Sequence, residues 1–157
     1  DDRFPHLNMY GKIDLTERTG DGKVVVTDFK TGSSKTTGVI EKLDEEGRLS
    51  VHLRQLAMYS YLLQGVEKDT QVATSRLLFL EEYQNEKNAL YSTHIDEEQI
   101  DMLKKDIADY DELVKSGGWV DRPCNFKSYG KQTECEYCKR AKNIYVQGKA
   151  LHIQNKR

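Results

Sequence analysis

Two segments near the N-terminus carry the residue pattern of β-strands. Residues 7–17 are rich in β-forming residues and end in an apolar–polar alternation, and residues 23–29 contain three consecutive valines. Between them, Thr19-Gly20-Asp21-Gly22 is typical of a tight turn, because Asp-Gly tolerates the positive backbone angle that such turns need. The pattern therefore predicts an antiparallel hairpin, followed over residues 31–48 by a polar loop.

The spacing of apolar residues changes to a helical period after this loop. Residues 51–64 have that period, and Gly65 is expected to end the helix in a left-handed cap. Two more strands are predicted over residues 76–82 and 89–95, joined by a polar turn around residues 85–88.

A second helix is predicted from Asp96 to about Lys115. Asp96 with Gln99 three residues later fits a capping box, and two glycines follow the helix. Strands on both sides of one helix, followed by another helix, indicate an α/β domain with a mixed central sheet flanked by helices. We expect one domain over residues 1–157, with its core at about 7–115 and a basic, cysteine-containing region at about 119–157.

Composition agrees with a single domain that has a modest core and a charged surface. The 157 residues are 37% hydrophobic and 32% charged. No apolar run approaches the roughly 18 residues that span a bilayer, and no signal segment opens the chain, so we expect no membrane partner. Three cysteines, an odd number, do not close a disulfide framework, which favours an intracellular, cytoplasmic protein.

The charge is segregated along the chain although the net charge is only -2. Residues 96–115 hold eight acids and three bases, whereas residues 124–157 hold eight bases and two acids. The basic C-terminal third can therefore meet phosphates, although a solvated charged surface explains the same pattern equally well.

The most informative residues are two carboxylates and a lysine. In a strand, residues i and i+2 point to the same face, so Asp28 and Lys30 emerge side by side, and the hairpin turn brings Asp14 to the same place. Two carboxylates suit Mg²⁺ or Mn²⁺, and a neighbouring lysine orients water and stabilises developing charge, as phosphodiester hydrolysis requires. The alternative is a solvent-exposed ion pair between Asp28 and Lys30, which contributes little.

A polar pair on the first helix joins this group. Gln55 and Tyr59 are spaced i, i+4, and His52 lies three residues before Gln55, so all three share one helix face. Such side chains contact a DNA phosphate or position the attacking water through the lysine. In the alternative interpretation Tyr59 packs in the core and Gln55 sits at its border.

Three motifs in this order resemble the PD-(D/E)XK nuclease superfamily, specifically its RecB-like branch. They are Gly-x-Ile-Asp at residues 11–14, Asp-Phe-Lys-Thr-Gly at residues 28–32 and Gln-x-x-x-Tyr at residues 55–59. The resemblance implies a restriction-endonuclease-like core and a Mg²⁺- or Mn²⁺-dependent deoxyribonuclease, more often an exonuclease than an endonuclease. It also implies DNA repair or recombination as the setting, with a helicase motor in the same polypeptide or complex, or else a CRISPR-adaptation-type nuclease.

The resemblance also implies a role for each matching residue. By similarity, Asp14 and Asp28 would be metal ligands together with the carbonyl of Phe29. Lys30 would be the catalytic lysine, with Gln55 and Tyr59 as the branch-specific pair beside it.

Two departures from the family pattern affect what we expect. Relatives usually carry a further ligand on a helix before the first strand, and this chain begins too late to include it. We therefore expect weak activity or none from the 157 residues alone. A catalytically weakened DNA- or partner-binding module of the same fold is the alternative.

The second departure concerns the cysteines. Many relatives hold an iron–sulfur cluster with one upstream cysteine and a C-terminal trio, in which a C-x-x-C pair is followed by a third cysteine after five residues. Cys135 and Cys138 reproduce the pair, but Ile144 stands where the following cysteine is expected. Cys124 supplies a third thiol, so the set still lacks a fourth ligand. A zinc site made by the Cys135–Cys138 pair with His152 also lacks a clear fourth ligand unless Cys124 folds back to it, and we expect no metal on these thiols. A zinc-ribbon-like adaptor built on them is the remaining alternative.

Overall fold

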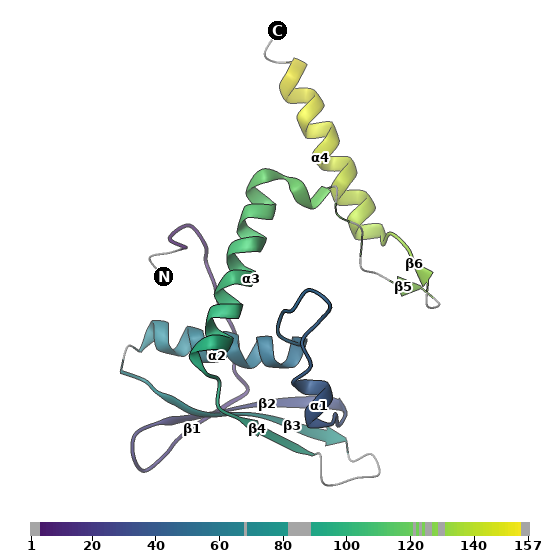
Figure 1. Ribbon diagram of the computed structural model, residues 1–157. Coiled ribbons are helices and arrows are strands. Elements are labelled where there is room, and N and C mark those ends of the chain that lie inside the picture. The colour runs from purple at the N-terminus through teal and green to yellow at the C-terminus, as the bar shows by residue number, and fades with distance from the viewer. Residues whose placement is uncertain are drawn as a thin grey trace. The chain divides into compact units, whose positions relative to one another are not determined.

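A computed structural model describes residues 4–67, 69–81, 89–120, 122, 124, 127–128 and 131–154 (Figure 1). The chain forms two compact units, Asp1–Ile107 and Ala108–Arg157. Within the described chain, no helix combines the length and the apolarity needed to cross a bilayer.

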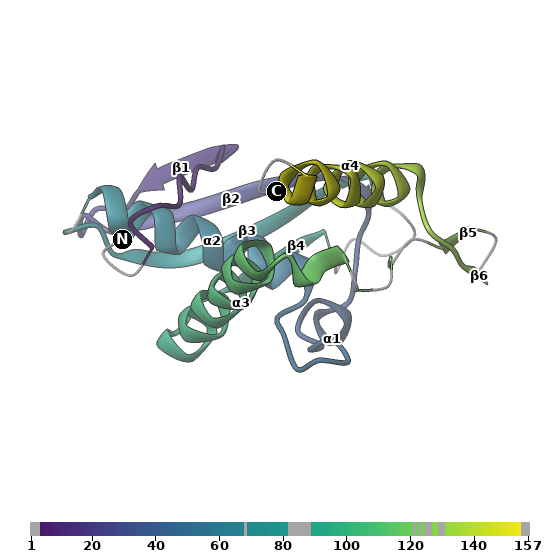
Figure 2. The ribbon, with the colours of Figure 1, turned by 90° about the horizontal axis from the view of Figure 1, so that it is seen from above.

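A four-stranded mixed sheet is the framework of the first unit. Its strands lie in the order β1 (Leu15–Arg18), β2 (Val24–Ser33), β3 (Val72–Glu81) and β4 (Leu90–Thr93). The β1–β2 and β3–β4 pairs are antiparallel, whereas β2 and β3 are parallel. Parallel neighbours need a crossover connection, and here α1 (Thr37–Ile40) and α2 (Val51–Val66) lie between them in the chain (Figure 2). The predicted mixed sheet with flanking helices is therefore confirmed.

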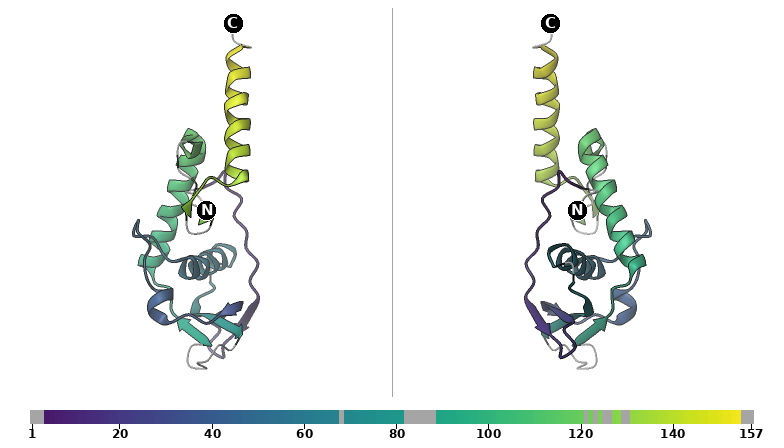
Figure 3. Two further views of the ribbon diagram at one scale, coloured as in Figure 1. Left: turned by 90° about the vertical axis from the view of Figure 1, so that its right-hand side faces the viewer. Right: turned by 90° about the vertical axis from the view of Figure 1, so that its left-hand side faces the viewer.

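Helix α2 covers one face of this sheet and builds the core with it. Figure 3 shows α2 nearly end-on above the strands. Leu53, Leu56 and Ala57 of α2 are buried in one cluster with Val26 of β2 and Leu77 of β3. The N-terminal part of α3 (Glu97–Ser116) packs on the same cluster. The face of α2 that carries residues 53, 56 and 57 therefore fixes its orientation on the sheet.

Local signals in the sequence set the main turns and caps. Gly22 has a φ of 81°, and its N–H donates to the Thr19 carbonyl at 2.9 Å, as the predicted hairpin turn requires. Asp96 and Gln99 form the predicted capping box, with Asp96 Oδ1 accepting from the Gln99 N–H at 2.8 Å. Ser50 caps α2 by accepting from the Leu53 N–H.

The first predicted strand is much shorter than expected. Only its last part belongs to β1, and residues 7–14 run irregularly. The reason is a close approach to α2, because a Cβ on Gly11 would lie 3.0 Å from Leu62 Cδ1 and 3.7 Å from Tyr59. Residues 7–14 pass close over α2 instead of pairing with β2. Glycine at position 11 permits this close passage because it has no side chain.

Several element boundaries also differ from the prediction. Strand β2 continues to Ser33, and α1 interrupts the expected loop because Ile40 is fully buried. Helix α2 passes through Gly65 to Val66, and its C-cap is Glu67 with a φ of -119°, so no left-handed cap forms. Strand β3 starts at Val72 rather than at residue 76. The predicted turn at residues 85–88 lies outside the described residues.

The part of the second unit that the structure describes contains the end of α3 and four further elements. A 3-10 turn, Gly118–Val120, precedes the short antiparallel strands β5 (Lys127–Ser128) and β6 (Lys131–Gln132), and α4 (Glu136–Gln154) follows. Trp119 and Tyr145 meet edge to face with ring centroids 5.4 Å apart. The sequence pattern had predicted no fold for this region.

Candidate active site

Strand β2 carries Asp28 and Lys30 on the face that α2 covers. Alternation puts them on the same side as Val24 and Val26, which are buried in the core cluster. Lys30 Nζ lies 2.7 Å from Asp28 Oδ2, and the Asp28 side chain is only 4% exposed while that of Lys30 is 23% exposed. Asp28 and Lys30 are therefore not a solvent-exposed ion pair at a strand end. A carboxylate as buried as that of Asp28 needs partners that compensate its charge.

Helix α2 supplies those partners. Gln55 Nε2 donates to Asp28 Oδ1 at 2.8 Å, and the Tyr59 hydroxyl donates to the same oxygen at 3.0 Å. The Gln55 Oε1 atom accepts from Lys30 Nζ at 2.5 Å, and Gln55 Nε2 also donates to the Tyr59 oxygen at 2.7 Å. Gln55 thus bridges the acid and the lysine, and both predicted helix residues lie directly on Asp28.

Asp14 reaches the same place from the other side of β2. The last pair of the β1–β2 register is Leu15 with Thr27, so one further step puts Asp14 opposite Asp28. Its Oδ2 atom accepts a hydrogen bond from the backbone N–H of Phe29 at 2.9 Å. Five predicted residues, with Phe29 through its backbone, are therefore brought together.

The carboxylates fit a hard divalent cation. Asp28 Oδ2 is buried, and its partner among the described residues is the Lys30 ammonium at 2.7 Å. A buried carboxylate beside the exposed carboxylate of Asp14 is the kind of oxygen donor set that Mg²⁺ and Mn²⁺ prefer. A role for the Phe29 carbonyl as a third donor stays a prediction.

Burial keeps the Tyr59 phenol protonated. Burial raises the pKa of Tyr59, donation by Gln55 opposes the shift, and the Asp28 carboxylate adds to it. A neutral phenol is a hydrogen-bond donor, so Tyr59 holds Asp28 Oδ1 across the whole neutral pH range.

His52 borders the site one turn before Gln55. Its ring meets Phe79 edge to face at a centroid distance of 6.2 Å, and its Nδ1 atom is buried with no hydrogen-bond partner among the described residues. Burial lowers the pKa of His52, and the charges of Lys30 and Lys35 lower it further. His52 is therefore a neutral neighbour of the site at pH 7.

Sequence reasoning gave Lys35 no role, yet its charge acts on His52 and so reaches the edge of the site. The available signal was its position five residues after Lys30 in the sequence.

Comparison with known proteins gives one match. The family model described as the PD-(D/E)XK nuclease superfamily matches residues 2–142. Searches among curated proteins and among solved structures found no match.

Proposed function

The chain belongs to the PD-(D/E)XK nuclease superfamily, and on that premise we propose that it hydrolyses phosphodiester bonds of DNA in a Mg²⁺- or Mn²⁺-dependent reaction. The superfamily points to a metal-dependent nuclease in general terms. The assignment of the reaction to particular side chains is our proposal.

One observation carries the proposal. Asp28 is a buried carboxylate on which Lys30, Gln55 and Tyr59 converge, and Asp14 accepts from the N–H of the next residue, Phe29. A strand-end ion pair with only a structural role would be exposed to solvent. Two carboxylates next to a lysine, one of them buried, instead suit the binding of a divalent cation.

Each residue then has a distinct task. Asp14 and Asp28 would hold the divalent ion, with the Phe29 carbonyl as a further donor, and the ion supplies electrophilic stabilisation of the phosphate and a more acidic water. Lys30 provides a fixed positive charge for the negative charge that develops on the phosphate. Gln55 fixes the Lys30 ammonium through its Oε1 atom, and Tyr59 fixes the Asp28 carboxylate.

The RecB-like motif order supports a finer proposal. We propose an exonuclease that acts in DNA repair or recombination together with a helicase motor in the same polypeptide or complex. The support is the order and spacing of the three motifs. Purification of the tagged protein at its native level, followed by an ATPase assay and digestion with and without ATP, tests the association. Digestion that is indifferent to ATP, with no ATPase present, would contradict it.

Digestion of matched DNA substrates tests the central proposal. The full-length protein is incubated with linear single-stranded, linear double-stranded and closed circular DNA in the presence of Mg²⁺, of Mn²⁺ and of EDTA. We expect loss of linear DNA with either metal, intact circles and no digestion in EDTA. Asp28→Asn should abolish digestion, whereas Asp101→Asn should not, because Asp101 is 72% exposed on α3. Digestion in EDTA, or by Asp28→Asn at the normal rate, would refute the proposal.

A further inference from the structure

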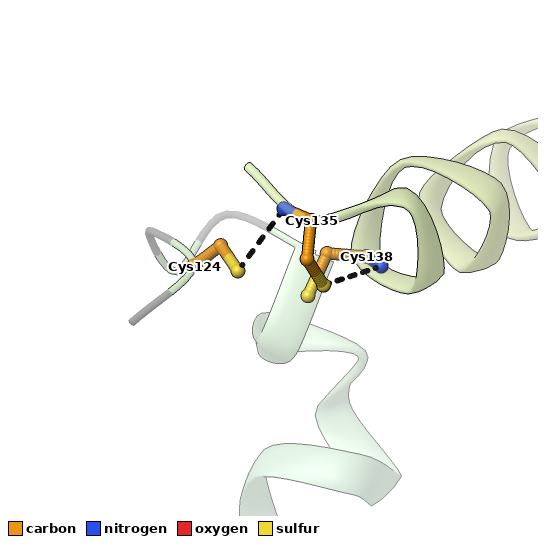
Figure 4. Close-up of side chains that lie close together, drawn as sticks. All are labelled: Cys124, Cys135 and Cys138. Carbon is orange, nitrogen blue, oxygen red and sulfur yellow. Dashed lines mark hydrogen bonds between the residues drawn. The ribbon is translucent and has the colours of Figure 1, made fainter. Parts of the chain in front are cut away.

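A group of three cysteines lies in the C-terminal unit, which is Ala108–Arg157. The Sγ atoms of Cys124, Cys135 and Cys138 all lie within 4.8 Å of one another (Figure 4). Cys124 precedes the β5–β6 hairpin, and Cys135 and Cys138 lie at the start of α4 after it. The hairpin therefore brings together thiols that are ten intervening residues apart, which the spacing alone did not indicate.

Backbone groups already point at these sulfurs. The Cys135 N–H donates to Cys124 Sγ at 3.5 Å, and the Cys138 N–H donates to Cys135 Sγ at 3.4 Å (Figure 4). Such bonds to sulfur stabilise a thiolate, and outer-sphere hydrogen bonds of this kind orient metal ligands. Cys138 also lies in the first turn of α4, where the helix dipole favours negative charge.

The two lysines of α4 that follow Cys138 most closely each pair with a glutamate. Lys139 pairs with Glu136 at 2.9 Å, and Lys142 pairs with Glu134 at 2.7 Å. Three thiolates at this spacing would repel one another, and a metal ion bound to all three would offset that repulsion.

The described residues of the C-terminal unit contribute nothing to the buried core cluster. Every member of that cluster found in the described chain precedes residue 108. Units of this size commonly need a metal or a disulfide in place of a core, and no disulfide joins these three cysteines. A metal ion would fasten the segment of Cys124 to the start of α4.

The sulfur distances favour one ion over a cluster. A tetrahedral ion with Zn–S bonds of about 2.3 Å separates its sulfurs by about 3.8 Å, so the observed grouping needs little adjustment. In a four-iron cluster each thiolate binds a different iron, which requires wider separation and four thiolates. Residue 152 lies 14 residues beyond Cys138 on α4, about 21 Å along a continuous helix.

We propose that Cys124, Cys135 and Cys138 bind one Zn²⁺ ion that fastens the C-terminal unit. Thiolate sulfurs select this ion over Mg²⁺. No described residue adds a fourth donor to the group, so the fourth position is open to water or to a donor elsewhere in the protein. This site replaces the expectation of metal-free thiols and is independent of the proposed nuclease function.

Metal content measures the site directly. The 157-residue protein, expressed with Zn²⁺ and purified under reducing conditions, should contain one zinc per chain by mass spectrometry and neither iron nor sulfide. Co²⁺ added to the metal-free protein should give thiolate charge-transfer absorption that Zn²⁺ abolishes. Cys124→Ser, Cys135→Ser and Cys138→Ser should each weaken Zn²⁺ binding at least tenfold. Tyr137→Ser is the matched control, because Tyr137 lies between two of the ligands but is 87% exposed.

Thiol modification keeps the test valid if a serine variant fails to fold. In the unaltered protein, Zn²⁺ should slow the reaction of all three cysteines with a thiol reagent, whereas Mg²⁺ should not. Asp28→Asn should retain the zinc, which separates this site from the nuclease site. Iron with sulfide, full zinc content in the serine variants, or no protection by Zn²⁺ would each overturn the proposal.

Discussion

The Tyr59 hydroxyl donates a hydrogen bond to Oδ1 of Asp28 over 3.0 Å, joining the middle of α2 to the end of the buried part of β2. Tyr59 is at the same time a member of the core cluster. The Tyr59 side chain therefore both packs α2 in the core and orients Asp28, the candidate metal ligand.

This relationship predicts a double effect of Tyr59→Phe. Loss of a buried hydrogen bond to a carboxylate should lower the free energy of unfolding by about 1.5–3 kcal/mol. DNA cleavage should fall roughly tenfold, which corresponds to about 1.4 kcal/mol of lost positioning. Urea unfolding and single-turnover cleavage measure the two effects. Tyr10→Phe is the control, since Tyr10 is 93% exposed, and equal behaviour of the two variants would contradict the prediction.

Gln55→Leu should separate catalysis from DNA binding. The substitution removes the donor to Asp28 and the acceptor of Lys30 at once, so the cleavage rate should fall more than the affinity for DNA. Cleavage rates and binding titrations with a short duplex provide the comparison. Gln64→Leu, at an exposed position near the end of the same helix, should change neither quantity. A Gln55→Leu protein that cuts normally would mean that the bridge has no catalytic role.

The environment of His52 predicts a pH-dependent stability. Because burial lowers its pKa in the folded protein, folding favours the neutral ring. This contribution is fully present above about pH 6.5, the unfolded value, and is lost as the pH falls through the folded value. As the pH falls from 8 to 5, the unfolding free energy of the unaltered protein should decrease relative to that of His52→Gln. In an NMR titration, Lys30→Ala should raise the pKa of His52, since it removes one of the charges that lower it; an unchanged value would contradict the assigned contact.

The core under the site predicts a large effect of Leu56→Ala. Leu56 is completely buried between α2 and the sheet, so the truncation should cost about 2–5 kcal/mol of unfolding free energy. Val51→Ala on the same helix should cost far less, because Val51 is 75% exposed. Chemical denaturation of both variants distinguishes them. Similar losses would mean that α2 does not pack as described.

Local patterns predicted the parts of the fold that local chemistry controls. The Asp21-Gly22 turn and the Asp96 capping box form as expected, because each depends on a few neighbouring residues. The i, i+4 spacing of Gln55 and Tyr59 also put both side chains on one face, and Asp28 lies on that face.

Long-range contacts account for what the sequence did not reveal. The strand expected over residues 7–17 is shortened by the passage of Gly11 over α2. Cys124 comes close to Cys135 and Cys138 because the chain between them folds back as a hairpin. Gly65 stays helical, and the helix ends at Val66 with Glu67 as its C-cap, where Glu67 pairs with the distant Arg18. Contacts between residues so far apart in sequence are not visible in a local pattern.

The most direct test of the account is the single-turnover cleavage rate of Lys30→Ala with saturating Mg²⁺ or Mn²⁺, measured beside Lys23→Ala. Lys23 lies just before the same strand and pairs with the exposed Asp21, so it is a matched control outside the site. The account predicts a loss of about a hundredfold or more for Lys30→Ala, with DNA affinity nearly unchanged, because the lysine acts on developing charge. Cleavage by Lys30→Ala at the rate of Lys23→Ala would contradict the proposed mechanism.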